Sequence, residues 1–202
     1  MTDSTHADPA TPPVKWSSII VSAYLPTLMS SLGYGAVIPL IPLTAVHIGA
    51  SAALAAAIAA LVGIGQIIGD VPAGWLVTKI GEKWSLVIAM LIDAVALVSM
   101  GLVHHLGLLA VAVFVNGMAG AVYGIARQNY LTVAIPYRYR ARALSTLGGV
   151  FRVGWFVGPM AGSWILREAS MSWAYGFASV ASVLAAAVTT VMPDLSLIHI
   201  SE

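Results

Sequence analysis

The sequence predicts an all-α integral membrane protein with six transmembrane helices. Of its residues, 59% are hydrophobic and only 8% are charged, and the mean hydropathy is +0.93. A soluble globular domain carries about 25% charged residues, so this composition excludes a water-soluble fold. The apolar residues also gather in segments of about 20 or more, the length that crosses a bilayer as a helix. Helices are expected because backbone groups in hydrocarbon must be bonded within their own segment.

Six apolar segments follow one another with short polar connections. Their approximate ranges are 17–46, 52–77, 84–103, 106–135, 143–166 and 173–192. A membrane β-barrel would need short alternating strands, and residues 52–60 do not alternate. Pro26, Pro39 and Pro42 predict a bent first helix, and Pro159 predicts a kink in the fifth.

Both ends of the chain differ from this helical region, which we place at residues 16–193. Residues 1–15 are polar and Pro-rich, which is typical of a disordered tail. They lack the basic start of a cleavable signal peptide. Residues 194–202 resemble the translated read-through of a sequencing adapter, so we expect a truncated gene product here.

Basic residues lie mainly on one side of the predicted membrane. Arg167 alone lies on the other side, against seven on the side of the N-terminal tail. The seven are Lys15, Lys79, Lys83, Arg127, Arg138, Arg140 and Arg142. Because Lys and Arg are enriched in cytoplasmic loops, we expect a cytoplasmic N-terminus and an inner or plasma membrane location.

The composition also excludes several kinds of site. A net charge of +1 gives no indication of a nucleic-acid partner, and the chain has no cysteine. Disulfides, thiolate metal sites and thiol nucleophiles are therefore excluded together. The five histidines are scattered through tail and loop positions without ligand spacing, so we expect no metal and no cofactor.

Two predicted helices carry a stripe of polar residues on one face. The stripes are Tyr24, Thr27, Ser31 and Tyr34 on the first helix, and Asn116, Tyr123 and Arg127 on the fourth. The family resemblance described below implies that both stripes line a central cavity; the alternative is hydrogen bonding between helices inside the bundle. Gln66, a single polar residue of the second helix, is interpreted as a packing residue.

Asp93 and Arg152 are the deepest ionisable residues. Each lies nine residues into its predicted helix, or about 13 Å at 1.5 Å per residue, near the middle of a core about 30 Å thick. Ionisable groups at such depth are costly and tend to be functional. We interpret Arg152 as a cavity residue, for an anion contact or proton coupling, and Asp93 as a structural buried acid. Their equal depth permits an ion pair.

Glycines at helical spacing allow close helix contacts. They form three sets, which are Gly65 with Gly69, Gly120 with Gly124, and Gly154 with Gly158 and Gly162. Static packing is one interpretation, and smooth faces that permit rocking between two halves are the other.

The connection between the second and third helices resembles motif A of the major facilitator superfamily. That motif reads Gly-x-x-x-Asp-Arg-x-Gly-Arg-Arg, often preceded by Asp-x-Pro-x-Gly. The matching residues are Asp70, Pro72, Gly74, Lys79, Gly81 and Lys83. Thr78 replaces the motif's Asp, and Glu82 replaces the first Arg after the Gly. The resemblance implies that this connection takes part in switching between inward- and outward-open states. Because the motif's Asp is missing here, we expect this role to pass to Asp70 or to be weakened.

The fifth predicted helix is similar to motif C, which is typical of the proton-coupled efflux branch. Its matching residues are Gly154, Gly158, Pro159 and Gly162. Ser145 and Ser163 stand at two further Gly positions of the motif. Motif B matches poorly, because Val113 occupies the position of the family's membrane Arg.

The resemblance covers residues 17–193 and implies half of the family fold. That fold has two halves, each an inverted repeat of three helices, so this chain corresponds to the N-terminal half and lacks its C-terminal partner. It implies a secondary transporter in the lipid bilayer, with proton-coupled efflux of a small organic compound or drug as the leading function. Uptake of a sugar or organic acid is the alternative, and a six-helix scaffold or oligomeric channel is the alternative of another class. An enzyme is not expected.

Overall fold

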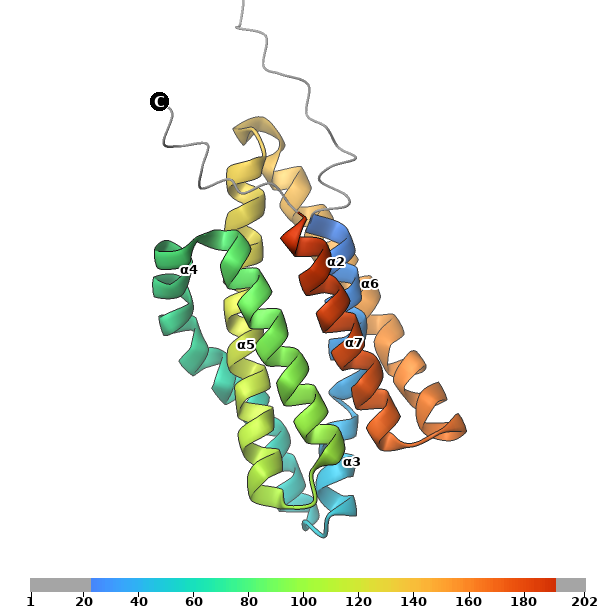
Figure 1. Cartoon of the computed structure of the whole chain (residues 1–202). Helices are drawn as coiled ribbons and strands as arrows, with labels where there is room; N and C mark the ends of the chain where they lie inside the picture. Colours follow the sequence, from blue (N-terminus) through green and yellow to red (C-terminus); the bar gives the residue numbers. More distant parts are fainter. Residues whose placement is uncertain (1–22, 192–202) are drawn as a thin grey trace, which may run out of the picture.

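The computed structural model describes residues 23–191, and all of the regular structure in that range is helical. The elements are α2 (Leu25–Val37), α3 (Leu40–His47), α4 (Ala52–Leu102), α5 (Leu106–Ala134), α6 (Tyr137–Glu168) and α7 (Met171–Thr190). They run up and down in one bundle (Figure 1), so the predicted helical class is confirmed for this range. The predicted tail at 1–15, the first residues of the first helix and the segment 194–202 lie outside the described residues.

The first predicted helix is divided into α2 and α3 at Ile38 and Pro39. The Ile38 N–H still bonds the Tyr34 carbonyl at 3.2 Å, whereas Pro39 has no N–H to donate and stands at the start of α3. The helix is thus interrupted at one of the three predicted prolines, since Pro26 lies in the first turn of α2 and Pro42 lies within α3. Helix α6 continues through Pro159.

Helix α4 joins the second and third predicted helices and turns back at Gly81. This residue has φ 81° and ψ 165°, a conformation that is almost confined to glycine. The Ser85 hydroxyl donates to the Gly81 carbonyl at 2.7 Å. A straight helix of 51 residues would extend about 76 Å at 1.5 Å per residue. The turn instead lays the two arms of α4 beside the rest of the bundle (Figure 1). The predicted loop at 78–83 is helical apart from Gly81.

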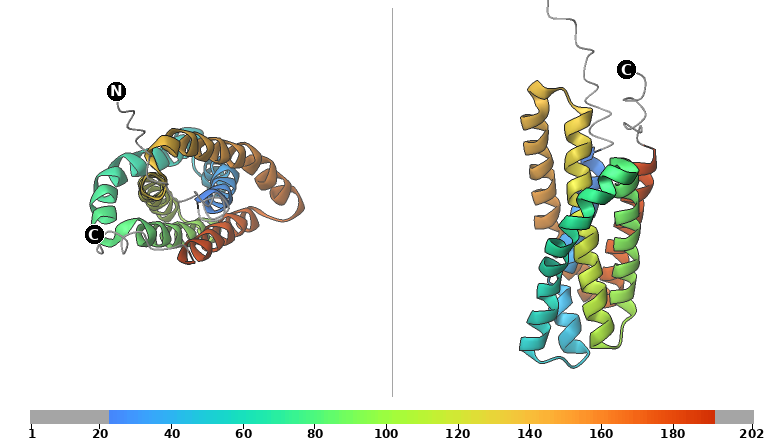
Figure 2. Two further views of the ribbon diagram at one scale, coloured as in Figure 1. Left: turned by 90° about the horizontal axis from the view of Figure 1, so that it is seen from above. Right: turned by 90° about the vertical axis from the view of Figure 1, so that its left-hand side faces the viewer.

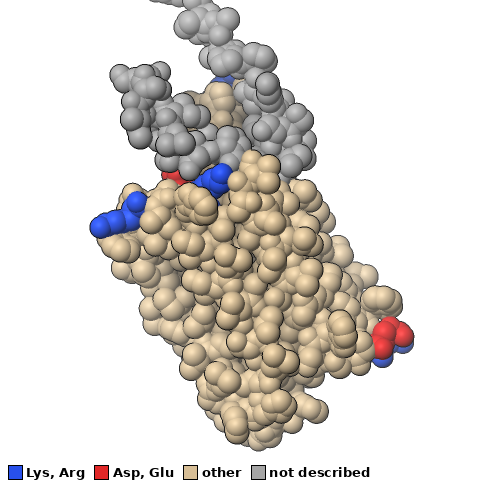
Figure 3. Space-filling model, in the orientation of Figure 1, with Lys and Arg blue, Asp and Glu red and all other residues tan. Residues whose placement is uncertain are grey.

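Four helical segments are long and apolar enough to cross a membrane, judged by length and composition. They are Leu25–His47, Ala52–Leu102, Leu106–Ala134 and Met171–Thr190. Helix α6 is more polar and begins at Tyr137, earlier than the predicted residue 143, because basic residues that reach water do not end a helix. On the face shown in Figure 3, charged residues lie at the ends of the molecule and the surface between them is uncharged.

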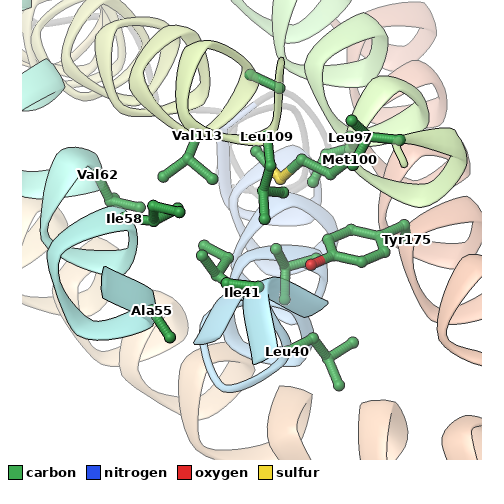
Figure 4. Close-up of a cluster of buried hydrophobic side chains, with 14 of the residues drawn as sticks. Leu40, Ile41, Ala55, Ile58, Val62, Leu97, Met100, Leu109, Val113 and Tyr175 are labelled. Atoms are coloured by element: carbon green, nitrogen blue, oxygen red, sulfur yellow. The ribbon is translucent and has the colours of Figure 1, made fainter. Parts of the chain in front are cut away.

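Viewed along the bundle, α2 and α5 lie between α4 on one side and α6 with α7 on the other (Figure 2, left). A buried core fills the end where α3 meets α4, α5 and α7 (Figure 4). Ile41 and Leu109 are fully buried there, and the Tyr175 hydroxyl lies within 2.8 Å of Thr44 Oγ1. This core anchors one end of the bundle and leaves the middle free for polar groups.

Three glycines of α6 let this helix lie directly on α2. A Cβ atom at Gly158 would come within 2.5 Å of the Leu32 carbonyl oxygen and 2.7 Å of the Ala36 nitrogen. Gly154 and Gly162 meet the same helix at Ser31 and Ala36. The motif C-like residues therefore form a packing ridge, as close contact between small residues requires.

A second close contact joins the first arm of α4 to α5. A Cβ atom at Gly69 would lie 2.9 Å from the Met118 Cα. Gly65 faces the backbone of Phe114 and Gly117, and Gly117 in turn faces the Val62 carbonyl. Gly120 and Gly124 do not take part, since Gly120 has only the Gln66 side chain nearby and Gly124 has open space.

We expect Gly158→Ala to destabilise the bundle by about 1–3 kcal/mol, the usual cost of an overpacked contact. The added methyl group would meet backbone atoms of α2, which cannot move without separating the helices. Gly148→Ala on the same helix is the control, because nothing lies within 4 Å of its added Cβ. Thermal unfolding of the purified protein in detergent measures both, and equal melting temperatures would contradict the packing role of Gly158.

Candidate functional site: a polar cavity

The helices form a partly open cavity of about 370 Å³, within the usual range of small-molecule pockets. It is lined by α2, both arms of α4, α5, α6 and α7. The lining residues are Ser30, Tyr34, Gln66, Ala89, Met90, Asp93, Ala119, Gly120, Tyr123, Gly124, Arg127, Phe151, Trp155 and Ser182. Within residues 23–191, no three His, Cys, Asp or Glu side chains come together as they would at a metal site.

Asp93 is held in the cavity wall by two other helices. Asn116 Nδ2 of α5 donates to its Oδ1 at 2.6 Å, and Ser182 Oγ of α7 donates to its Oδ2 at 2.7 Å. Asn116 and Ser182 are 3% and 2% exposed. Because a buried carboxylate is costly without hydrogen-bond donors, these two bonds stabilise Asp93 in place. Asp93 therefore bonds two other helices, in line with its predicted structural role, and it also lines the cavity.

Gln66 and Tyr34 form a second polar contact across the cavity wall. Gln66 Nε2 on the first arm of α4 donates to the Tyr34 hydroxyl of α2 at 3.1 Å. The interpretation of Gln66 as a packing residue is incomplete, since its amide also lines the cavity. This hydrogen bond joins α4, which packs closely on α5, to α2, which packs closely on α6.

Arg127 lies between two aromatic rings. Its guanidinium carbon is 5.3 Å from the centroid of the Tyr123 ring and 5.1 Å from that of Phe151, which are cation–π distances. Its Nε and Nη1 atoms are buried and have no hydrogen-bond partner in the part of the chain that the structure describes. The residue is about 10 Å from the end of α5 at 1.5 Å per residue.

The structure brings three of the eight predicted cavity residues to the cavity, namely Tyr34, Tyr123 and Arg127. The other five lie outside its wall: Tyr24, Thr27, Ser31, Asn116 and Arg152. Arg152 is exposed, and Asp93 bonds Asn116 and Ser182 instead of the permitted partner Arg152. The cation of the cavity is therefore Arg127.

The residues Thr27 and Ser31 show why helical spacing misplaced part of the site. Both are fully buried, and their hydroxyl groups donate to the Ala23 carbonyl at 2.7 Å and the Leu28 carbonyl at 3.0 Å. Short hydroxyl side chains readily bond carbonyls of their own helix. Polar spacing alone therefore does not separate a cavity face from a packed face. Tyr24 differs, because its hydroxyl donates to a carbonyl of another helix, that of Ala143 in α6, at 3.4 Å.

Seven lining residues are not among those selected from the sequence. They are the apolar Ala89, Met90 and Ala119, and the polar or aromatic Ser30, Phe151, Trp155 and Ser182. Phe151 and Trp155 are an aromatic pair at i and i+4 of the helix that carries the glycine ridge, and this spacing was an available signal. Ser30 and Ser182 stand in ordinary apolar segments, and no sequence signal marks them.

The motif A-like residues lie near the Gly81 turn of α4 and outside the cavity wall. The Thr78 hydroxyl donates to the Trp75 carbonyl at 2.8 Å, so it is occupied by its own helix. Lys79 Nζ lies 5.1 Å from the centroid of the Trp75 ring. Asp70 is exposed on the same arm.

Comparison with known proteins identifies the class. The sequence model of the Major Facilitator Superfamily matches residues 23–195. The chain therefore belongs to this superfamily of membrane transporters, and it is a multi-pass membrane protein.

The relatives are longer proteins. Uncharacterized MFS-type transporters of two Mycobacterium tuberculosis strains are each 25% identical over 167 residues, covering 83% of this chain and 24% of the relative. The tetracycline resistance protein, class H, of Pasteurella multocida is 28% identical over 171 residues, covering 80% of this chain and 40% of the relative. The chain thus spans about a quarter of the length of the mycobacterial relatives.

We expect the bond between Asp93 and Ser182 to couple the two residues energetically. In a double-mutant cycle of Asp93→Ala and Ser182→Ala, the coupling should be about 0.5–2 kcal/mol, the range of side-chain hydrogen bonds between membrane helices. Ser99→Ala is the control, because the Ser99 hydroxyl donates to the Val95 carbonyl of its own helix. Unfolding free energies in bicelles provide the measurement. A coupling near zero for Ser182, or an equal one for Ser99, would contradict this contact.

Proposed function

We propose that this chain is the N-terminal half of a proton-coupled secondary transporter that exports a small organic compound. The observation that carries the proposal is the cavity of about 370 Å³, which has an acid, Asp93, and a cation, Arg127, in its wall. Ionisable side chains at membrane depth tend to serve substrate or proton pathways. Asp93 is the group that would carry the proton.

The direction of transport is supported by one relative, whose name states tetracycline resistance. The glycine ridge of α6 is similar to the motif typical of the efflux branch. These two features favour export of an organic compound over uptake of a sugar or organic acid.

The proposed topology has six transmembrane segments, namely α2 with α3, the two arms of α4, α5, α6 and α7. The glycine turn at Gly81 supports two crossings by α4. Lys79 near this turn and Arg138 and Arg140 near the α5–α6 connection supply the positive charge of the same end. By the distribution of basic residues, this end and the N-terminus would be cytoplasmic. The substrate would bind between this half and a C-terminal half, as in transporters built from repeats.

We expect the full-length protein to lower the accumulation of substrate compounds in a host that lacks its own drug pumps. A protonophore should abolish this effect, because export would be driven by the proton gradient. Uptake that depends on the gradient would favour the permease alternative. A protein that moves no compound of a broad panel, with its C-terminal half present, would favour the scaffold or channel.

The hairpin of α4 gives a sharper expectation. Asp70→Asn should lower the export rate about tenfold or more, the size of a typical conformational coupling, because Asp70 is the acid that would serve the switching role. Thr78→Ala should leave export unchanged, since the Thr78 hydroxyl only bonds its own helix. Export rates at equal expression measure both variants. Export at the wild-type rate by Asp70→Asn would contradict a role of Asp70 in switching between inward- and outward-open states.

A further inference from the structure

We propose that Arg127 forms an anion-binding subsite of the cavity, which takes the carboxylate of an organic substrate with an aromatic body. This inference rests on the proposed function, because it names the substrate class of the same cavity. It begins from the two unbonded nitrogen atoms of the Arg127 side chain.

Two of the three guanidinium nitrogen atoms of Arg127 have no hydrogen-bond partner in the described residues. Its Nε and Nη1 atoms are buried without an acceptor in the described range 23–191. The rings of Tyr123 and Phe151 attract the positive charge, but a ring face replaces no oxygen acceptor. Buried polar groups normally have hydrogen-bond partners, and a guanidinium pairs best with the two oxygens of a carboxylate. A ligand carboxylate would supply these acceptors once the Arg127 side chain turns further into the cavity that it lines, since both atoms have almost no exposed surface in this structure.

The acid in the same cavity wall does not serve as that partner. Both oxygens of Asp93 already accept hydrogen bonds, one from Asn116 and one from Ser182. Asp93 also lies about 18 Å along α4 from the Gly81 turn, counted at 1.5 Å per residue, whereas Arg127 lies about 10 Å from the end of α5. The wall of the cavity therefore contains an acid whose two oxygens both accept hydrogen bonds and a cation with two unbonded nitrogen atoms within the described residues.

The surroundings of Arg127 fit an aromatic body. Tyr123, Phe151 and Trp155 line the cavity together with Arg127. Gly124 stands one residue beyond Tyr123, and a Cβ there would meet nothing within 4 Å. An anion held by Arg127 would thus have ring faces beside its apolar part and no side chain of Gly124 in its way.

The test uses the full-length protein in nanodiscs and three probes that share a naphthalene ring. These are 2-naphthoate, the neutral 2-naphthamide and the cationic 2-naphthylmethylamine, with affinities measured by equilibrium dialysis. Wild-type protein should bind naphthoate about 10- to 100-fold more tightly than naphthamide, as expected for hydrogen bonds to a charged group. Equal affinity for these two, no binding of naphthoate, or preference for the amine would overturn the proposal without any variant.

Variants then assign the preference to Arg127. Arg127→Gln should remove the preference for naphthoate and leave the affinity for naphthamide unchanged, and Arg127→Lys should keep part of the preference. Arg167→Gln is the matched control, because Arg167 is an exposed arginine in the last turn of α6, outside the cavity wall, and it should behave as wild type. An equal loss for both probes in Arg127→Gln, or an equal loss of the preference in Arg167→Gln, would show that the preference is not due to Arg127.

Failure of this inference differs from failure of the proposed function. Protonophore-sensitive export that does not depend on Arg127 would sink the anion subsite and leave the transporter intact. Naphthoate binding that depends on Arg127, without proton-dependent export, would support the anion subsite and contradict the proposed proton-coupled export.

Discussion

The close contact between α6 and α2 fixes where the other helices can lie. No hydrophobic effect drives helices together within lipid, so van der Waals contact between backbones must supply much of the attraction. The three glycines of α6 provide this contact on one side of the bundle, and Gly65, Gly69 and Gly117 provide it between α4 and α5. Two tight pairs result. The polar cavity is lined by residues from both pairs and from α7.

Polar side chains join these tight pairs across the cavity. Asp93 links α4, α5 and α7 through Asn116 and Ser182, and Gln66 links α4 to α2 through Tyr34. The same groups that hold the helices in register therefore face the space that a ligand would occupy. A ligand that bonds Gln66 or Asp93 would therefore compete with a hydrogen bond between helices.

The helices could be predicted from the sequence because apolar length, glycine and proline act locally. The division at Pro39 and the turn near Gly81 follow from the geometry of single residues, and the family follows from motifs at defined helices. The cavity was predicted only in part. Thr27 and Ser31 share their helical face with Tyr34, yet short hydroxyl groups bond their own helix while a long tyrosine reaches its neighbour. Ser30 and Ser182 come to the cavity through tertiary packing, which one sequence does not encode locally.

Gly120 and Gly124 enlarge the cavity because they have no side chains. On α4 and α6, glycines bring helices together, but these two stand in the cavity wall of α5. The shape available to a ligand is therefore set partly by side chains that are missing. A wall of this kind can be reshaped by adding one methyl group without breaking any helix contact. The shape of the cavity could thus change during evolution while the bundle that carries it stays the same.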